Sequence, residues 1–397
     1  MVSDSSSGST DAMVGNAAPI RVAVLQRILP GYRLELFRRL SASAGIELRL
    51  FIGEDIPNTK WRSAGDLSGV DVVRLKTRFI RLRSRLMPWH SGLRKALAEF
   101  DPDVVVAEGE SNFLSYLQAL WYRRSHRSVK LIHWGGGGIP GQVNSPGSMG
   151  SRFKLYMQKK FDGMLVYSTF CKNWLVEAGH SADRISVAVN VGNTGQHLSA
   201  ADGLGETQAE ARERLGLGDR FTVFYVGAMD ANKRPDVLLD LAGLVDSSLF
   251  NFVLAGDGPE AEPLKRRAAA EGLNNVYVVG RVSDDLPLHY RASDVVVIPG
   301  RGGIVISEAM AWRLPVVVHE ADGTELDLVS DGETGYVLNS GTVESFKSVL
   351  ESMQAHPEGS GKLGRNGRAS LESAFRVEQY AASVASAIQK IGAQRPG

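Results

Sequence analysis

The sequence is poor in cysteine and lacks long apolar runs, and these absences exclude several classes of protein. Cys171 is the single cysteine, so the chain forms no internal disulfide, which fits a reducing cytoplasm. No segment provides the ~18 apolar residues that a membrane span needs. Residues 1–18 contain no Lys or Arg and no apolar core segment, so they are unlike a signal peptide and are predicted to be a disordered tail.

Basic residues prevail in the first half of the chain and acidic residues in the second half. Residues 20–190 carry 26 Lys and Arg against 14 Asp and Glu, whereas residues 191–397 carry 19 against 28. The densest basic run, Arg74–Lys95, has Phe, Leu, Met and Trp among its cations. Such a run is usually a solvated surface, but here it also favours an anionic membrane surface as partner. No nucleic-acid-binding motif accompanies it, so we expect no nucleic-acid partner and a cytoplasmic protein that is peripheral on the inner face of the membrane.

Alternating strand and helix patterns fill both halves of the 397 residues and predict an α/β protein with two Rossmann-like domains facing across a cleft. The first domain is expected over 19–200, from the strand Ile20–Gln26 to the strand-like run Arg184–Asn193. A polar linker is expected over 201–216 and the second domain over 217–375. The apolar pattern within 376–397 predicts a helix that crosses back to the first domain.

The most informative segment is Pro299–Pro315, which follows the apolar run Asp294–Ile298. Gly302 and Gly303 leave the backbone bare where a helix begins, and free N–H groups at a helix N-terminus can receive a phosphate. Glu308 follows within about one and a half turns, near enough to reach a hydroxyl of the same ligand. The segment therefore indicates a site for a phosphorylated sugar or nucleotide, with a plain strand-to-helix turn as the alternative.

Neighbouring segments support the ligand site. A strand over Phe221–Val226 ends at Gly227 and is followed by the basic pair Lys233 and Arg234. The runs Phe252–Glu260 and Val276–Ser283 are also strand-like and end in glycine or proline turns. Parallel sheets bind ligands at the carboxyl ends of their strands, which is where these turns fall.

In this order the segments resemble the C-terminal domain of retaining glycosyltransferases of family 4, which have the GT-B fold. The matching positions, which span nearly all of 220–340, are Gly227, Lys233, Gly256 to Pro259, Gly280, Ser293, Asp294, Pro299, Gly303, Glu308, Pro315 and Asp331–Gly335. Two positions depart from the family pattern. Ala228 stands where many relatives carry an Arg for the donor diphosphate, and Gly300 stands where the first Glu of a Glu-x7-Glu motif contacts the donor sugar. Arg301 and Arg234 are near enough in sequence to replace the lost charge.

The resemblance implies roles for particular residues. Lys233 would neutralise the leaving diphosphate together with N–H groups near Gly302, Gly303 and Ile304, so that no metal or other cofactor is needed. Glu308 would hold the ribose and Val282 would lie near the base. The remaining predicted donor-binding residues are Gly31, Gly227 and Arg234.

In the first domain, the turn Pro30–Arg33 and the strand end His133–Gly137 resemble the acceptor-side pattern of the same family. His133 is predicted to end a strand that faces the cleft and is our second catalytic candidate, although a lone histidine is more often structural.

We expect a retaining hexosyltransferase-type enzyme that moves a sugar from a nucleotide diphosphate sugar to a glycan or lipid-linked acceptor, in cell-surface polysaccharide or glycoconjugate synthesis. Two alternatives remain open. One is a nucleotide-sugar epimerase on the same two-domain plan. The other is a nucleotide-sugar-binding protein without catalysis, which Ala228 and Gly300 suggest.

Overall fold

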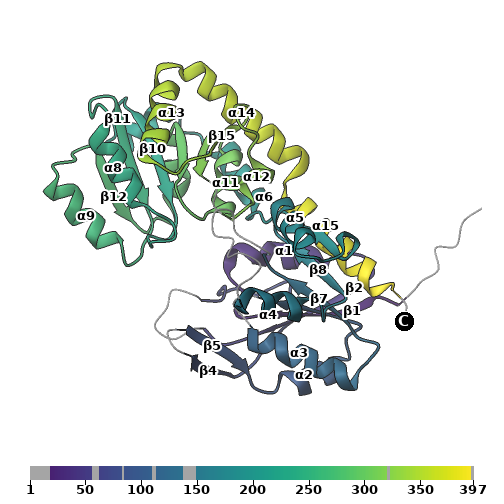
Figure 1. Ribbon diagram of the computed structural model, residues 1–397. Coiled ribbons are helices and arrows are strands. Elements are labelled where there is room, and N and C mark those ends of the chain that lie inside the picture. The colour runs from purple at the N-terminus through teal and green to yellow at the C-terminus, as the bar shows by residue number, and fades with distance from the viewer. Residues whose placement is uncertain are drawn as a thin grey trace, which may run out of the picture.

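A computed structural model describes residues 18–55, 62–82, 85–109, 113–136, 149–319 and 322–394. Almost all of the predicted tail 1–18 lies outside these residues, as does Arg83 of the basic run. The described chain forms two α/β lobes, the first domain below and the second above it in Figure 1.

The first domain is built on a parallel sheet of the order β3-β2-β1-β6-β7-β8-β9, which counts seven strands over the described residues. The strands are β1 Ile20–Gln26, β2 Ile46–Ile52, β3 Val72–Arg74, β6 Val104–Glu108, β7 Lys130–Trp134, β8 Gly163–Val166 and β9 Ile185–Val187. The helices are α1 Gly31–Ser41, α2 Leu93–Phe100, α3 Phe113–Ser125, α4 Met149–Gln158 and α5 Thr169–Glu177, with a 3-10 turn at Ala182–Arg184.

The basic run Arg74–Lys95 forms a separate antiparallel hairpin of β4 Thr77–Leu82 and β5 Arg85–His90. Phe79 pairs with Pro88 and Arg78 with Trp89 across the two strands. The hairpin packs on α3, where the ring of Trp89 meets that of Trp121 at 6.0 Å between centroids. The described residues of the basic run therefore belong to the first domain.

The second domain has a parallel sheet of the order β12-β11-β10-β13-β14-β15, six strands in the part of the chain that is described. The strands are β10 Phe221–Val226, β11 Phe250–Ala255, β12 Val276–Gly280, β13 Val295–Ile298, β14 Val316–His319 and β15 Gly335–Leu338. The helices are α6 Thr194–Gly203, α7 Gln208–Leu215, α8 Asp236–Leu244, α9 Ala261–Ala270, α10 Leu286–Ala292, α11 Gly303–Ala311, α12 Glu325–Leu328, α13 Val343–Ala355 and α14 Pro357–Ala374.

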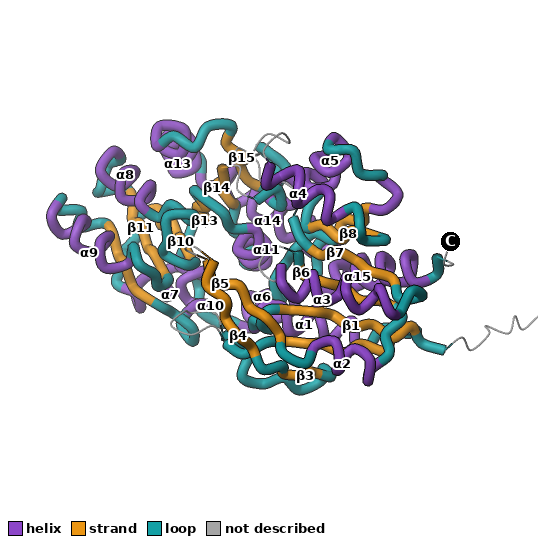
Figure 2. The backbone as a smooth tube through the Cα atoms, turned by 60° about the horizontal axis from the view of Figure 1, so that its bottom comes forward, coloured by secondary structure: helices purple, strands orange, loops and turns teal. Residues whose placement is uncertain are grey.

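Apolar packing on both faces of each sheet explains the nearly continuous hydrophobic strands. All six residues of β11 are buried, as expected for a parallel strand that helices cover on both sides. Figure 2 shows these helices in purple beside the orange strands of both sheets. One apolar cluster runs from one face of the first sheet to one face of the second, so the two domains share part of their core.

Two segments join the domains. Residues 201–216, expected as a linker, are largely helical: they hold the end of α6 and all of α7, and these helices pack on α10 and α11 of the second domain. A capping box between Thr207 and Glu210 begins α7. The final helix, α15 Val377–Gly392, is drawn in yellow in Figure 1 and returns to the first domain, where it packs on α1 and the sheet. Its Glu378 lies 3.0 Å from the guanidinium of Arg39.

The structure contains no helix, in the residues it describes, with the length and hydrophobicity that crossing a bilayer requires.

Candidate functional site

The turns that follow β10 and β11 meet backbone to backbone at the carboxyl edge of the second sheet. The amide of Gly227 donates a hydrogen bond to the Ala255 carbonyl at 3.0 Å. Gly227 and Gly256 have φ values of 154° and 145°, and a Cβ on Gly256 would overlap the Gly227 carbonyl. Glycine is therefore needed here for close approach, because no side chain fits between the turns.

Lys233 lies at this edge and points toward the loop after β13. Its Nζ donates a hydrogen bond to the carbonyl oxygen of Arg301. Burial lowers the pKa of Lys233, and the carboxylates of Asp322 and Asp230 oppose that shift. The ammonium group thus lies among the loops that follow β10, β13 and β14, where parallel sheets bind their ligands.

The turn that carries Lys233 leaves no room for a side chain at Gly300. A Cβ at this position would overlap the carbonyl oxygen of Asn232 and lie 2.8 Å from the Lys233 carbonyl carbon. The amide of Arg301 also donates to the Asn232 carbonyl at 3.1 Å. Backbone therefore fills the place where the family pattern expects a glutamate side chain.

The N-terminus of α11 begins directly after this loop and carries no side-chain cap. Gly302 is the N-cap residue with no side-chain hydrogen bond, and Gly303 begins the helix. A Cβ at Gly303 would overlap the Thr324 hydroxyl, so only glycine lets the loop before α12 approach. Ile304 follows in the first turn, and its Cγ2 would lie 3.0 Å from a Cβ at Gly192, at the end of the first domain. Free N–H groups of this first turn can bind an anion.

Glu308 sits one turn further along α11, between α10 and α6. Its Oε2 accepts a hydrogen bond from the Tyr290 hydroxyl at 2.8 Å, and its Oε1 lies 3.6 Å from Nε2 of His197. Burial raises the pKa of Tyr290, so its hydroxyl remains a donor. The Glu308 side chain keeps 18% of its surface exposed, which leaves room for a ligand hydroxyl.

The other predicted residues of the second domain lie at the same edge. Val282 follows β12 and packs half-buried against the core. Arg234 adopts a positive φ of 51°, and its Nη2 donates to the Gly341 carbonyl at 3.3 Å. The structure thus brings Gly227, Lys233 and the α11 N-terminus together, whereas Val282 lies two strands away, beyond β11.

In the first domain, the carboxyl edge of the sheet holds a polar cluster that the sequence did not reveal. Gly31 begins α1 in open space, and two residues later Arg33 is buried. The Arg33 guanidinium donates to Gln26 Oε1 at 2.7 Å and to the Tyr167 hydroxyl at 2.8 Å, and it lies 3.8 Å from Glu108. In the sequence, Arg33 was marked only by its position in the turn Pro30–Arg33, because Tyr167 and Glu108, its partners, are distant in the chain.

His133 lies inside the first domain rather than on an open surface. It is 2% exposed, and its ring meets those of Tyr116 and Phe161 edge to face, at 5.7 and 5.8 Å between centroids. Burial lowers the pKa of His133 to about 3, so the imidazole is neutral at pH 7. Its Nδ1 finds no hydrogen-bond partner among the described residues. The catalytic role of His133 stays a prediction, and this enclosure would have to open before a substrate could reach the ring.

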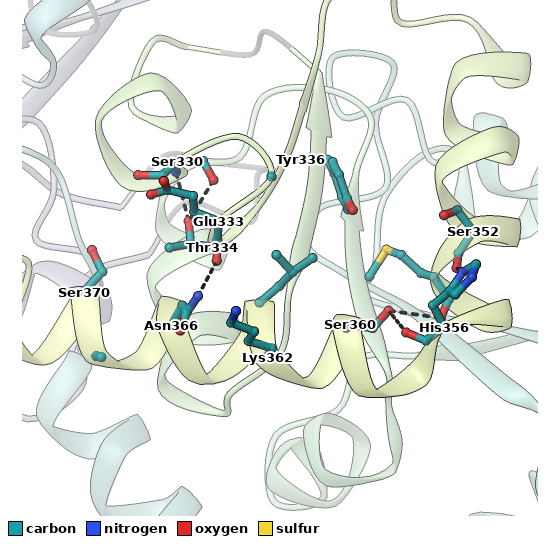
Figure 3. Close-up of a pocket in the computed structure, with 15 residues that line it drawn as sticks. Ser330, Glu333, Thr334, Tyr336, Ser352, His356, Ser360, Lys362, Asn366 and Ser370 are labelled. Atoms are coloured by element: carbon teal, nitrogen blue, oxygen red, sulfur yellow. Dashed lines mark hydrogen bonds between the residues drawn. The ribbon is translucent and has the colours of Figure 1, made fainter.

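A groove of about 760 Å³ in the second domain lies apart from these residues, between α13, α14 and the loop before β15 (Figure 3). It is lined by hydroxyl groups and by His356, Lys362 and Asn366, and Asn366 donates to the Glu333 carbonyl at 2.9 Å. None of the predicted donor residues lines it. The described residues contain no group of three or more His, Cys, Asp or Glu that could hold a metal ion, and the expectation that no metal is needed stays a prediction.

Family models match both halves of the chain. The model of glycosyl transferases group 1 matches residues 207–370, and that of Glycosyltransferase Family 4 matches residues 32–192. The alpha-D-kanosaminyltransferase of Streptomyces kanamyceticus is 34% identical over 166 residues, which are 40% of this chain and 43% of the relative. The D-inositol 3-phosphate glycosyltransferase of Rhodococcus jostii is 26% identical over 373 residues, 86% of this chain and 78% of the relative.

A further relative is the GDP-mannose-dependent alpha-(1-6)-phosphatidylinositol monomannoside mannosyltransferase of Mycolicibacterium smegmatis, 31% identical over 177 residues, 41% of this chain and 46% of the relative. The chain thus spans less than half the length of this mannosyltransferase and of the kanosaminyltransferase. Among solved structures, Anabaena HepE in complex with UDP and glucose superposes with a TM-score of 0.70 at 17% identity, covering 92% of this chain and 98% of HepE. Sucrose-phosphate synthase from Thermosynechococcus elongatus superposes with a TM-score of 0.68 at 20% identity, with the same coverage of 92% and 98%.

Proposed function

Because the chain belongs to the GT4-type glycosyltransferases and has the GT-B fold, we propose that it transfers a sugar from a nucleotide diphosphate sugar to a glycan or lipid-linked acceptor with retention of anomeric configuration. The reaction would serve cell-surface polysaccharide or glycoconjugate synthesis. The observation that carries the proposal is the meeting of a half-buried ammonium group, Lys233, with the uncapped N-terminus of α11 at one sheet edge.

The chemistry asked of these residues is electrostatic. As the bond between sugar and phosphate breaks, negative charge grows on the departing diphosphate. Lys233 and the N–H groups of Gly303 and Ile304 would stabilise that charge, and preorganised donors of this kind are worth most where water is excluded. Glu308 would accept hydrogen bonds from ribose hydroxyls, held in place by Tyr290 at 2.8 Å. Val282 would border the base.

The donor is assigned only as a nucleotide diphosphate sugar. The mannosyltransferase relative is named for GDP-mannose, and the HepE structure holds UDP and glucose. Both names contain a nucleotide diphosphate but differ in the base. They therefore support the diphosphate-binding part of the site and leave the base and the sugar to experiment.

The acceptor would be reached from the first domain, whose basic surface favours a partner with phosphate groups. We include an anionic membrane surface, on the inner face of the membrane, as a partner of the enzyme. The net charge of +12 over residues 20–190 supports this, because basic residues near an anionic surface add to binding.

A thermal-shift screen against UDP- and GDP-sugars, followed by transfer assays with the hits, tests the function. A donor at a hundredfold its dissociation constant adds about 2.7 kcal/mol of stability. Formation of a glycoside with release of the nucleoside diphosphate would support the proposal, and its anomeric configuration reports retention. Donor sugar that isomerises without leaving the nucleotide would indicate an epimerase instead.

Gly300 is the reason to consider a second candidate function, nucleotide-sugar binding without catalysis. Backbone occupies the place of the glutamate that the family pattern assigns to the donor sugar. A nucleotide-sugar-binding protein without catalysis would show strong donor stabilisation and no donor turnover with any acceptor. Donor hydrolysis or transfer above the rate of the Lys233→Ala variant would count against it.

A further inference from the structure

A groove on the first domain gathers positive charge and exposed aromatic rings. It has a volume of about 740 Å³ and lies between α3, α4 and the segments that lead into β7 and β8. Its cationic side chains come from Arg123, Arg124, Arg127, Lys130 and Lys160, against the single carboxylate of Asp162. None of these five residues belongs to the Arg74–Lys95 run that the sequence singled out.

The charge of the groove is largely uncompensated. Asp162 is used inside the fold: it accepts from the Arg123 guanidinium at 2.9 Å and from the Leu131 amide at 2.8 Å. Among the described residues, Arg124, Arg127 and Lys160 have no carboxylate within ion-pair distance. Arg124 and Arg127 are also exposed, near the end of α3 and just after it. Charges of one sign held together in this way attract an anionic surface over a Debye length of ~10 Å.

Two exposed aromatic rings border the groove. Trp121 on α3 is 43% exposed and Tyr156 on α4 is 56% exposed. Trp and Tyr are common at the level of lipid headgroups, because each side chain has an apolar ring and one polar group that can contact water. Lys160 lies 4.6 Å from the centroid of the Tyr156 ring, so charge and aromatic surface are presented together.

We propose that this groove, with its aromatic border, docks the protein on an anionic phospholipid bilayer. The combination favours a bilayer over a soluble anion. Two exposed large rings add nothing to the binding of phosphate alone, but they can enter the headgroup region while the cations bind lipid phosphates. The proposal deepens the membrane contact included in the proposed function by placing it on α3 and α4.

The groove and the Arg33 cluster lie at opposite edges of the first sheet. Lys130 is the first residue of β7 and Asp162 directly precedes β8, so the groove lies at the amino ends of these strands. The Arg33 cluster lies at the opposite, carboxyl edge, with Gln26 and Glu108 at the ends of their strands. The hairpin β4–β5 reaches the groove through the contact of Trp89 with Trp121, whereas its base at Thr77 is hydrogen-bonded to Glu54, just after β2. Figure 1 shows β4, β5, α2 and α3 together at the bottom of the first lobe. A bilayer that contacts the groove itself would therefore lie at the sheet edge opposite the Arg33 cluster.

Co-sedimentation of the full chain with phosphatidylglycerol-containing and pure phosphatidylcholine vesicles tests the proposal. Each basic side chain at an anionic surface strengthens binding by roughly fivefold. The triple variant Arg124→Ser/Arg127→Ser/Lys160→Ser should therefore bind anionic vesicles about a hundredfold more weakly than the wild type. The charge-matched control Lys265→Ser/Arg266→Ser/Arg365→Ser, on exposed residues of α9 and α14, should bind like the wild type.

A hairpin variant, Arg78→Ser/Arg81→Ser/Arg83→Ser/Arg85→Ser, separates the two membrane hypotheses. Loss of binding in this variant with normal binding in the groove variant would overturn the groove assignment and leave the membrane contact standing. Wild-type protein that binds neither vesicle, or both equally, would overturn both. Because the readout is binding alone, an enzyme without transfer activity can still support or refute the proposal.

Tryptophan fluorescence distinguishes a bilayer from a plain polyanion. Trp121 should shift to the blue when anionic vesicles bind, and Trp121→Phe, which keeps a ring against Trp89, should lose most of that shift. Inorganic polyphosphate should compete for the cations without causing the shift. Equal shifts in wild type and Trp121→Phe, or binding to polyphosphate as tight as to vesicles, would make the groove a general anion site and refute the docking role.

Discussion

Restoring the family glutamate at Gly300 should damage the site rather than complete it. In the folded chain a Cβ at this position would overlap the Asn232 carbonyl and lie 2.8 and 2.9 Å from the carbonyl carbon and Cα of Lys233. Those atoms are backbone, so relief requires the whole turn to move and not a side-chain rotation. Overpacking of this kind costs roughly 1–3 kcal/mol. Gly300→Glu and Gly300→Ala should therefore both lower stability, and both should move Lys233 away from the Arg301 carbonyl.

Thermal unfolding and donor binding of the two variants, side by side, measure this effect. A loss of 1–3 kcal/mol in a domain of this size corresponds to a fall in Tm of roughly 2–12 °C. The donor that stabilises the wild type should bind both variants more weakly, by a similar factor, because the Cβ alone causes the shift. Gly205→Ala, where nothing lies within 4 Å of the new methyl group, is the matched control and should leave both quantities unchanged. Wild-type Tm and donor affinity in Gly300→Ala would refute the reasoning.

Three further outcomes follow from the charged groups. Lys233→Ala should reduce turnover by roughly a hundred- to thousandfold, the cost of one preorganised donor, and a rate within a few-fold of wild type would remove Lys233 from the mechanism. Glu308→Gln should weaken donor affinity by roughly tenfold or more and Glu308→Ala further, measured by calorimetry, with unchanged affinity in both variants arguing against ribose contact. The folded-state pKa of His133 is about 3, below its unfolded value, so the unfolded state binds more protons and stability should fall as pH drops from 6.5 toward 3. In His133→Leu the slope over that range should be smaller by about 1.4 kcal/mol per pH unit in denaturant titrations, and an unchanged slope would contradict the buried neutral imidazole.

The sequence predicted well those features that are local in the chain. The strand ranges Ile20–Gln26 and Phe221–Val226 agree with β1 and β10 because each is a short apolar run bounded by turn residues. The start of a helix at Gly302 and Gly303 was also predicted, and α11 begins there. The hairpin of the basic run was not predicted, because Phe79 and Arg81 share one face of β4 and so break the apolar–polar alternation that marks a strand.

What could not be predicted depends on residues that are distant in sequence. The partners of Glu308 come from α10 and α6, and His197 precedes it by 111 residues. Arg33 and Tyr167 meet over a separation of 134 residues. No short-range pattern encodes such pairs, because they arise only when the sheet order brings the strand ends together. The enclosure of His133 has the same origin, since Tyr116 and Phe161 belong to other segments.

The two departures from the family pattern therefore differ in physical kind. Ala228 is exposed, so a larger arginine side chain would fit at this position. Other cations remain at the same sheet edge. Gly300 is enclosed by the backbone of the Lys233 turn, so its missing side chain is a consequence of how that turn is folded. A single substitution can restore the arginine at position 228, and the Ala228→Arg variant should fold normally. The second can be reversed only together with the turn, which ties the position of Lys233 to the absence of the glutamate.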